Sequence, residues 1–156
     1  MNFPAEKIAK KLLKKGAMLA VAESCTGGLL AGTFTDLPGA SGFFRGGAVT
    51  YATETKTEIL GVPAELIARF GVVSAECAEA MARGAAEKFR ANFALSTTGI
   101  AGPDGGTPET PVGTVFIGIF TPSGTFSLRF RATGTTRDAV RREAVAAALS
   151  ALDARI

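Results

Sequence analysis

The sequence has 156 residues, 47% of them hydrophobic, and a formal net charge of +3 at pH 7. These values exclude a disordered chain, predict one domain over residues 1–156, and argue against nucleic acid as a partner. No apolar run approaches the roughly 18 residues that span a bilayer, and the lysine-rich start lacks a signal peptide's apolar segment. We therefore expect a cytoplasmic protein without a membrane partner.

The first half of the chain predicts alternating helices and strands. Apolar residues at helical spacing predict a helix over 4–16, with lysines on a solvated face. A buried strand over 18–23 follows, and a glycine turn at 24–28 leads into the next helix. A second strand is predicted at 48–51, and helical segments at 53–60 and 64–70.

The second half predicts a longer helix, three strands and a final helix. Ser74 has the position of an N-cap for an alanine-rich helix that reaches Phe89, and a strand follows at 93–99. Alternating segments at 112–120 and 125–132 flank a proline–glycine turn, which predicts an antiparallel hairpin. The last helix is predicted over 136–153.

Five strands interleaved with helices predict a layered α/β domain. We expect a parallel or mixed central sheet, helices on both faces, and the antiparallel hairpin at one edge. Ligands of such folds bind beyond the carboxyl ends of the strands. The loops that follow Glu23, surround Tyr51 and run over 98–111 are therefore the expected place of a functional site.

Two segments have the character of anion sites. Backbone N–H groups of the 24–28 turn could bind an anion, although a plain turn capped by Ser24 or Thr26 explains the same residues. The turn matches neither of the named nucleotide-binding motifs. Arg137, Arg141 and Arg142 crowd the start of the last helix, where the dipole disfavours cations. Either a bound phosphate resolves this conflict, or Asp138 and Glu143 neutralise the arginines in solvent.

The sequence contains no histidine, so a serine nucleophile would need another base. Ser41, Tyr51 and Lys56 lie within sixteen residues, and lysine is a known substitute for histidine. A free lysine is only about 0.1% neutral near pH 7.4, so its pKa would have to be lowered by burial. The spacing alone does not distinguish this chemistry from a structural role.

The chain has two cysteines, Cys25 and Cys77. Two cysteines without histidine form neither a disulfide framework nor a typical zinc site, so both are interpreted as reduced thiols. Nothing in the sequence around Cys25 indicates a lowered pKa. We expect no metal and no cofactor.

Four ordered motifs resemble one family across nearly the whole chain. They are AESCTGG at 22–28, GASGFFRGGAVTYATETKTEILGV at 39–62, TGIAGPDGGTPETPVGTV at 98–115, and TTRDAVRREA at 135–144. Together they are similar to the CinA carboxy-terminal domain family, the bacterial nicotinamide mononucleotide deamidases also called PncC. The chain resembles the stand-alone form of that family.

The resemblance implies an amidohydrolase that converts nicotinamide mononucleotide to nicotinic acid mononucleotide and ammonia in pyridine nucleotide salvage. It implies Ser41 as nucleophile with Tyr51 and Lys56 as activating partners, and Ser24 as the rival nucleophile. The expected substrate-binding residues are the following: Ser24, Thr26, Gly27, Gly28, Gly99, Ala101, Gly102, Gly105, Arg137 and Arg141. Family members are often homo-oligomers. The alternative is a non-catalytic nucleotide-binding or regulatory domain, consistent with the competence and damage-inducible label that the family also carries.

Overall fold

A five-stranded mixed sheet forms the centre of the molecule. The computed structural model describes residues 3–156. The strands, in the spatial order β2-β1-β3-β4-β5, are β2 (Phe44–Val49), β1 (Leu19–Glu23), β3 (Phe93–Gly99), β4 (Thr114–Thr121) and β5 (Gly124–Arg131). β1 pairs in parallel with both β2 and β3, whereas β4 is antiparallel to β3 and β5. The predicted mixed sheet and its edge hairpin are confirmed.

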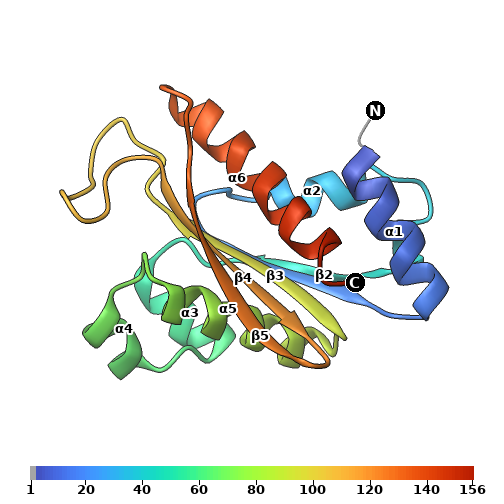
Figure 1. The fold of residues 1–156 in the computed structure, drawn as a ribbon. Helices are drawn as coiled ribbons and strands as arrows, with labels where there is room; N and C mark the ends of the chain where they lie inside the picture. Colours follow the sequence, from blue (N-terminus) through green and yellow to red (C-terminus); the bar gives the residue numbers. More distant parts are fainter. Residues whose placement is uncertain (1–2) are drawn as a thin grey trace.

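Helices cover both faces of the sheet, as predicted (Figure 1). α1 (Phe3–Lys15), α2 (Leu29–Thr35) and α6 (Arg137–Asp153) lie on one face, and α3 (Thr53–Leu60), α4 (Ala64–Phe70) and α5 (Ala75–Phe89) lie on the other. Successive side chains of β1 point to opposite faces. Leu19 and Val21 join the core beneath α1, α2 and α6, whereas Ala20 and Ala22 join the core beneath α5.

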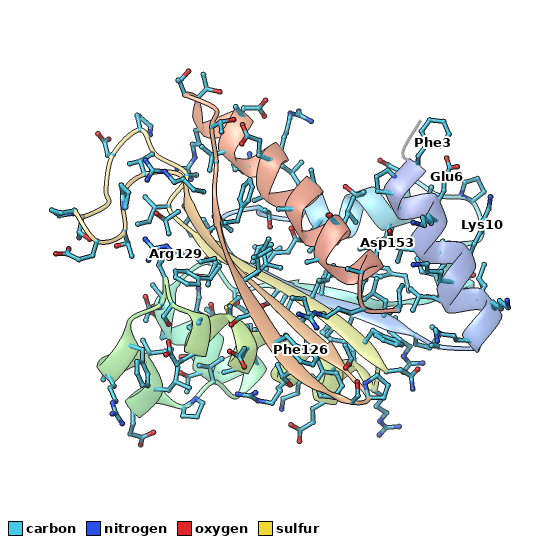
Figure 2. All side chains as sticks on the ribbon, viewed as in Figure 1. Phe3, Glu6, Lys10, Phe126, Arg129 and Asp153 are labelled. Atoms are coloured by element: carbon cyan, nitrogen blue, oxygen red, sulfur yellow. The ribbon has the colours of Figure 1, made fainter. Side chains whose placement is uncertain are left out.

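Two predicted helix starts are confirmed by their side-chain caps. The Ser74 hydroxyl accepts a hydrogen bond from the Cys77 N–H at 3.1 Å, and the Thr136 hydroxyl accepts one from the Ala139 N–H at 3.1 Å. At the other end of α6, Asp153 lies beside α1 (Figure 2). Its carboxylate accepts hydrogen bonds from Lys7 and Lys11 at 2.8 and 2.7 Å, so α1 and α6 are also joined by charge.

The second strand differs from its prediction. It was expected at 48–51, but β2 begins at Phe44 and ends at Val49. Gly46 and Gly47 resemble turn residues in sequence, yet they lie within the strand. A Cβ on Gly47 would overlap the side chain of Val21, so glycine is required there because β1 and β2 approach closely.

Gly118 of β4 should tolerate an added methyl group poorly. The Ser96 hydroxyl donates to the Ala78 carbonyl at 2.5 Å and accepts from the Gly118 N–H at 3.1 Å, which draws α5 onto the sheet. A Cβ on Gly118 would overlap both of these oxygens. Gly118→Ala should lower the free energy of unfolding by about 1–3 kcal/mol in urea denaturation. Gly32→Ala is the matched control, because its Cβ would meet nothing within 4 Å; an equal loss in both variants would contradict the prediction.

The parallel strands end together at one edge of the fold. Glu23 at the end of β1 pairs with Val49 of β2 and Thr97 of β3. The loop between β3 and β4 and the start of α6 lie at the same end (Figure 1).

In residues 3–156, no helix has the length and apolar character needed to cross a membrane.

Candidate active site

A cavity of about 170 Å³ lies at the carboxyl ends of the parallel strands, where a site was expected. Its walls come from the loops after β1, β2 and β3, from the segment before α5, and from the start of α6. The residues that line it are Ser24, Cys25, Tyr51, Lys56, Val72, Val73, Thr98, Gly99, Ala101 and Arg137. A larger hollow of about 400 Å³ lies between α3 and α4. Its lining includes no cysteine, lysine or serine, so the smaller cavity is the candidate active site.

Lys56 is the buried base candidate of this cavity. Its side chain, on α3, is only 1% exposed. Its Nζ lies 3.1 Å from the Ser24 Oγ, and donates to the Thr50 carbonyl at 2.5 Å and to the Tyr51 carbonyl at 3.4 Å. No salt bridge involves Lys56 within residues 3–156. Burial lowers the pKa of Lys56 from its ordinary value, against smaller opposing effects of Cys77 and Cys25.

The three partners of Lys56 can accommodate a neutral amine, the form that burial favours. A neutral amine has two N–H donors and one lone pair, whereas an ammonium has three donors and no acceptor. The carbonyls of Thr50 and Tyr51 can only accept, whereas the Ser24 hydroxyl accepts from an ammonium or donates to the lone pair of a neutral amine. The arrangement can therefore activate the Ser24 hydroxyl by removing its proton.

Ser24 begins the turn that follows β1. Its N–H donates to the Thr97 carbonyl of β3 at 3.0 Å, which fixes the turn to the end of the sheet. The side chain is nearly buried, yet it lines the cavity. Ser24 therefore presents its hydroxyl to both the base and the cavity.

Ser41 does not join Tyr51 and Lys56. It lies in a short 3₁₀ turn, Ala40–Gly42, that precedes β2, and the neighbouring Phe43 carbonyl accepts from Leu19 at the start of β1. The six residues of β2 separate this turn from the cavity by roughly 20 Å at about 3.3 Å per residue. The predicted grouping of Ser41 with Lys56 is wrong, because the strand between them carries the chain to the opposite end of the sheet.

Tyr51 and Arg137 meet at the mouth of the cavity. Arg137, the first residue of α6, donates to the Tyr51 hydroxyl at 2.9 Å and to the Gly102 carbonyl at 2.8 Å. Both side chains are exposed to solvent. Arg137 thus connects the loop after β2 with the loop after β3, and it lines the cavity.

The glycine turn does not offer the anion site that was expected at its helix start. Glu23 is fully buried, and its carboxylate accepts hydrogen bonds from the N–H groups of Gly28, Leu30 and Ala31 at 3.2, 2.9 and 3.0 Å. The protein's own carboxylate therefore occupies the place of an anion. A substrate phosphate at this position would be repelled.

The arginines at the start of α6 have separate partners. Arg141 donates to the carbonyls of Cys25 and Thr26 at 3.0 and 3.1 Å, so it supports the turn. Arg142 pairs with Asp138 at 2.8 Å on the surface, as the solvated alternative proposed. Of the three, only Arg137 lines the cavity.

Neither cysteine has the character of a nucleophile. Burial raises the pKa of the Cys25 thiol and of the Cys77 thiol to about 11. Both are free cysteines and buried. Since the thiolate is the reactive form, both remain inert thiols at neutral pH.

The other predicted binding residues divide between the cavity and its surroundings. Gly99 and Ala101 line the cavity, and Gly102 contributes a carbonyl to Arg137. Gly27 lies against Arg141, the buried Thr26 hydroxyl bonds Glu23 at 2.6 Å, and Gly105 is exposed on the long loop. The cavity also contains residues that the sequence reasoning missed: Val72, Val73 and Thr98. Glu23 was missed too, although a charged residue that ends an otherwise apolar strand is a usable signal.

Comparisons with known proteins agree with the motifs. The CinA C-terminal domain family matches residues 2–156. A CinA-like protein of Desulfotalea psychrophila is 52% identical over 134 residues, which are 86% of this chain and 32% of that protein. One of Geobacter sulfurreducens is 47% identical over 149 residues, or 96% of this chain and 36% of that protein. The chain thus spans about a third of the length of these relatives.

Solved structures show the same fold along the whole chain. The competence/damage inducible protein CihA from Agrobacterium tumefaciens has a TM-score of 0.93 at 41% identity, covering 98% of this chain and 93% of its own. The competence damage-inducible protein A from Klebsiella pneumoniae has a TM-score of 0.94 at 34% identity, covering 99% and 95%. On its motifs, its fold and these matches, the chain belongs to the CinA C-terminal domain family.

Proposed function

We propose that this protein hydrolyses the carboxamide of nicotinamide mononucleotide, giving nicotinic acid mononucleotide and ammonia. The observation that carries the proposal is the contact between the buried Lys56 amine and the Ser24 hydroxyl at 3.1 Å. A serine beside a neutral lysine is a pair suited to acyl transfer. Family membership supports the choice of substrate.

The proposed reaction begins with proton transfer from Ser24 to Lys56. The Ser24 Oγ attacks the carboxamide carbon, and a tetrahedral intermediate forms. The C–N bond then breaks, and ammonia leaves with the proton that Lys56 returns. Water, deprotonated by Lys56, attacks the acyl ester on Ser24, and the C–O bond to serine breaks to release the carboxylate product and regenerate the hydroxyl.

The N–H groups of Cys25 and Thr26 are the proposed donors to the oxyanion. The N–H groups of Ser24 and of 27–31 have acceptors in Thr97, in the turn itself, or in the Glu23 carboxylate. Within residues 3–156, the N–H groups of Cys25 and Thr26 donate no hydrogen bond to a backbone carbonyl. They directly follow the nucleophile, where a developing negative charge needs donors, and one good donor contributes about 3–4 kcal/mol.

The size of the cavity suits one end of the substrate. At about 170 Å³ it is smaller than the roughly 300–1,000 Å³ of cavities that enclose a whole ligand. The nicotinamide ring would enter toward Ser24, while the ribose and phosphate remain at the mouth. Arg137 lies at that mouth with donors to spare, and we assign it to the phosphate.

Arg137→Ala should weaken binding of the nucleotide far more than it slows turnover. We expect KM for nicotinamide mononucleotide to rise roughly 10- to 100-fold, the equivalent of a charge-assisted hydrogen bond. The preference over the dephosphorylated riboside should disappear in steady-state kinetics. Arg142→Ala is the matched control, since Arg142 pairs with Asp138 outside the cavity. An Arg137 variant that keeps the wild-type preference would remove the phosphate assignment.

Ammonia release from nicotinamide mononucleotide by the purified protein tests the proposed function directly. Chromatography should show nicotinic acid mononucleotide in equal amount. Binding of the nucleotide by calorimetry without any turnover would instead favour the non-catalytic nucleotide-binding role.

A further inference from the structure

Glu23 is a buried carboxylate that the proposed reaction does not use. It ends β1, directly before Ser24, and its side chain is fully buried. No lysine or arginine forms a salt bridge with it in residues 3–156. Instead it accepts four hydrogen bonds, from the Thr26 hydroxyl at 2.6 Å and from the N–H groups of Gly28, Leu30 and Ala31. Burying a carboxylate without a counter-charge costs free energy, so these hydrogen bonds are what compensates for it.

These four bonds span the whole turn. Their donors lie three, five, seven and eight residues after Glu23, so one side chain connects the end of β1, the middle of the turn and the first turn of α2. Leu30 and Ala31 belong to the start of α2, where N–H groups have no partner within the helix. Gly27 and Gly28 have positive φ, so regular secondary structure does not hold the turn in place.

Arg141 binds the carbonyl groups of the same turn. It donates to the carbonyls of Cys25 and Thr26 from α6, while Glu23 accepts from the N–H groups that follow them. The Glu23 carboxylate and the Arg141 guanidinium therefore fix the orientation of the peptide groups in the turn, the first by accepting from N–H groups and the second by donating to carbonyls. Of this turn, Ser24 and Cys25 line the cavity, and these contacts leave the Cys25 N–H group free to donate there.

We propose that Glu23 is a positioning residue, which holds the turn so that the Ser24 hydroxyl stays against Lys56 and the Cys25 N–H group stays at the cavity. The inference rests on the proposed function for its kinetic consequence, but not for the geometry. The role is indirect, because Glu23 contacts the turn and not the reacting atoms.

Glu23→Gln is the sharpest test, because it keeps the side chain's shape and the Oε1 contacts. Its amide nitrogen would face the Ala31 N–H, donor against donor, and release that side of the turn. We expect kcat to fall roughly 10- to 100-fold with KM within about twofold, since a displaced nucleophile slows chemistry and not binding. Glu79→Gln is the control: Glu79 accepts from Ser127 at 2.8 Å outside the cavity, and its variant should keep wild-type kinetics.

A second readout does not require activity. Lysine Hε–Cε NMR correlations report the titration of Lys56, whose signal is assigned by its absence in Lys56→Met. A loosened turn admits water to Lys56, so its pKa should rise toward the ordinary value in Glu23→Gln and stay unchanged in Glu79→Gln. The Cys25 and Cys77 thiols are the titratable groups that act on Lys56, and both remain in every variant.

The outcomes separate the two proposals. Wild-type kcat and wild-type Lys56 titration in a folded Glu23→Gln protein would overturn the positioning role, whatever the loss of thermal stability. Absence of ammonia release from the wild type would remove the proposed function, and the Lys56 titration alone would then decide the inference. If Glu23→Gln does not fold, Thr26→Val is the substitute, because it removes one hydrogen-bond donor to Glu23. It should raise the pKa of Lys56, and Thr26→Ser, which keeps the hydroxyl, should leave that pKa at the wild-type value.

Discussion

Ser24→Ala should lower kcat for nicotinamide mononucleotide by about 1,000-fold or more, because within residues 3–156 the Ser24 Oγ is the one side-chain oxygen that bonds the Lys56 amine. The change removes one atom, so the fold should persist, and circular dichroism with thermal denaturation checks that it does. Calorimetric affinity for the nucleotide should stay within about threefold, since the nucleophile contributes mainly to the transition state. The measurement is ammonia release under single-turnover and steady-state conditions.

Ser41→Ala is the matched control within the same chain. It deletes the same atom from an exposed 3₁₀ turn at the opposite end of the sheet. Its kinetics should equal those of the wild type. The opposite result would be loss of activity in Ser41→Ala with activity kept in Ser24→Ala. It would exclude Ser24 as the nucleophile and show that its contact with Lys56 has no catalytic role.

Local patterns predicted much of this fold. The alternation of apolar residues in β4 and β5 was sufficient for the hairpin, and Ser74 was recognisable as a cap because capping depends on residues three positions apart. The place of the site followed from the general behaviour of parallel sheets. Tyr51 was expected at the site because its loop follows a strand in that sheet, whereas Lys56 was reached from its spacing to Tyr51 in a sequence without histidine and from the family resemblance.

The errors arose where distant segments meet. Ser41 and Lys56 are fifteen positions apart but a full strand separates them, whereas Ser24 and Lys56 are 32 positions apart and touch across neighbouring parallel strands. Arg141 was assigned to a phosphate by a local argument about the helix dipole. The carbonyls that satisfy it lie more than a hundred positions away, and no local pattern contains them.

Lys56→Met should abolish turnover as completely as Ser24→Ala, because methionine keeps the length of the side chain and removes the base. Lys56→Arg is the charge control, since a guanidinium keeps the positive charge and cannot become a neutral base in a protein. We expect kcat at least about 1,000-fold below wild type in both variants. An arginine variant with substantial turnover would show that Lys56 acts through its charge.

The pH dependence of the wild type should follow the same group. Burial lowers the pKa of Lys56, so the neutral, active amine accumulates as pH rises through that lowered value. The ratio kcat/KM should rise with pH and then reach a plateau below the pH at which a free lysine would titrate. A profile that keeps rising up to pH 10 would show that the base titrates like a free lysine and would contradict the lowered pKa of Lys56.

The free energy of unfolding should also depend on the titration of Lys56, and it can be measured without substrate. Between the lowered pKa and the ordinary value of 10.5, the unfolded chain binds a proton at Lys56 that the folded protein does not. The free energy of unfolding contributed by Lys56 therefore increases with pH in this window, by up to about 1.4 kcal/mol per pH unit. Urea denaturation of wild type and Lys56→Met from pH 6 to pH 8 isolates it, because titrations that are not coupled to Lys56 cancel in the difference and the Cys25 and Cys77 thiols stay largely protonated below their ordinary pKa of 9.0. The wild type should gain on the variant as pH rises; a difference that shrinks with pH would mean that Lys56 is held as the ammonium, and a serine–lysine mechanism would then lack its base.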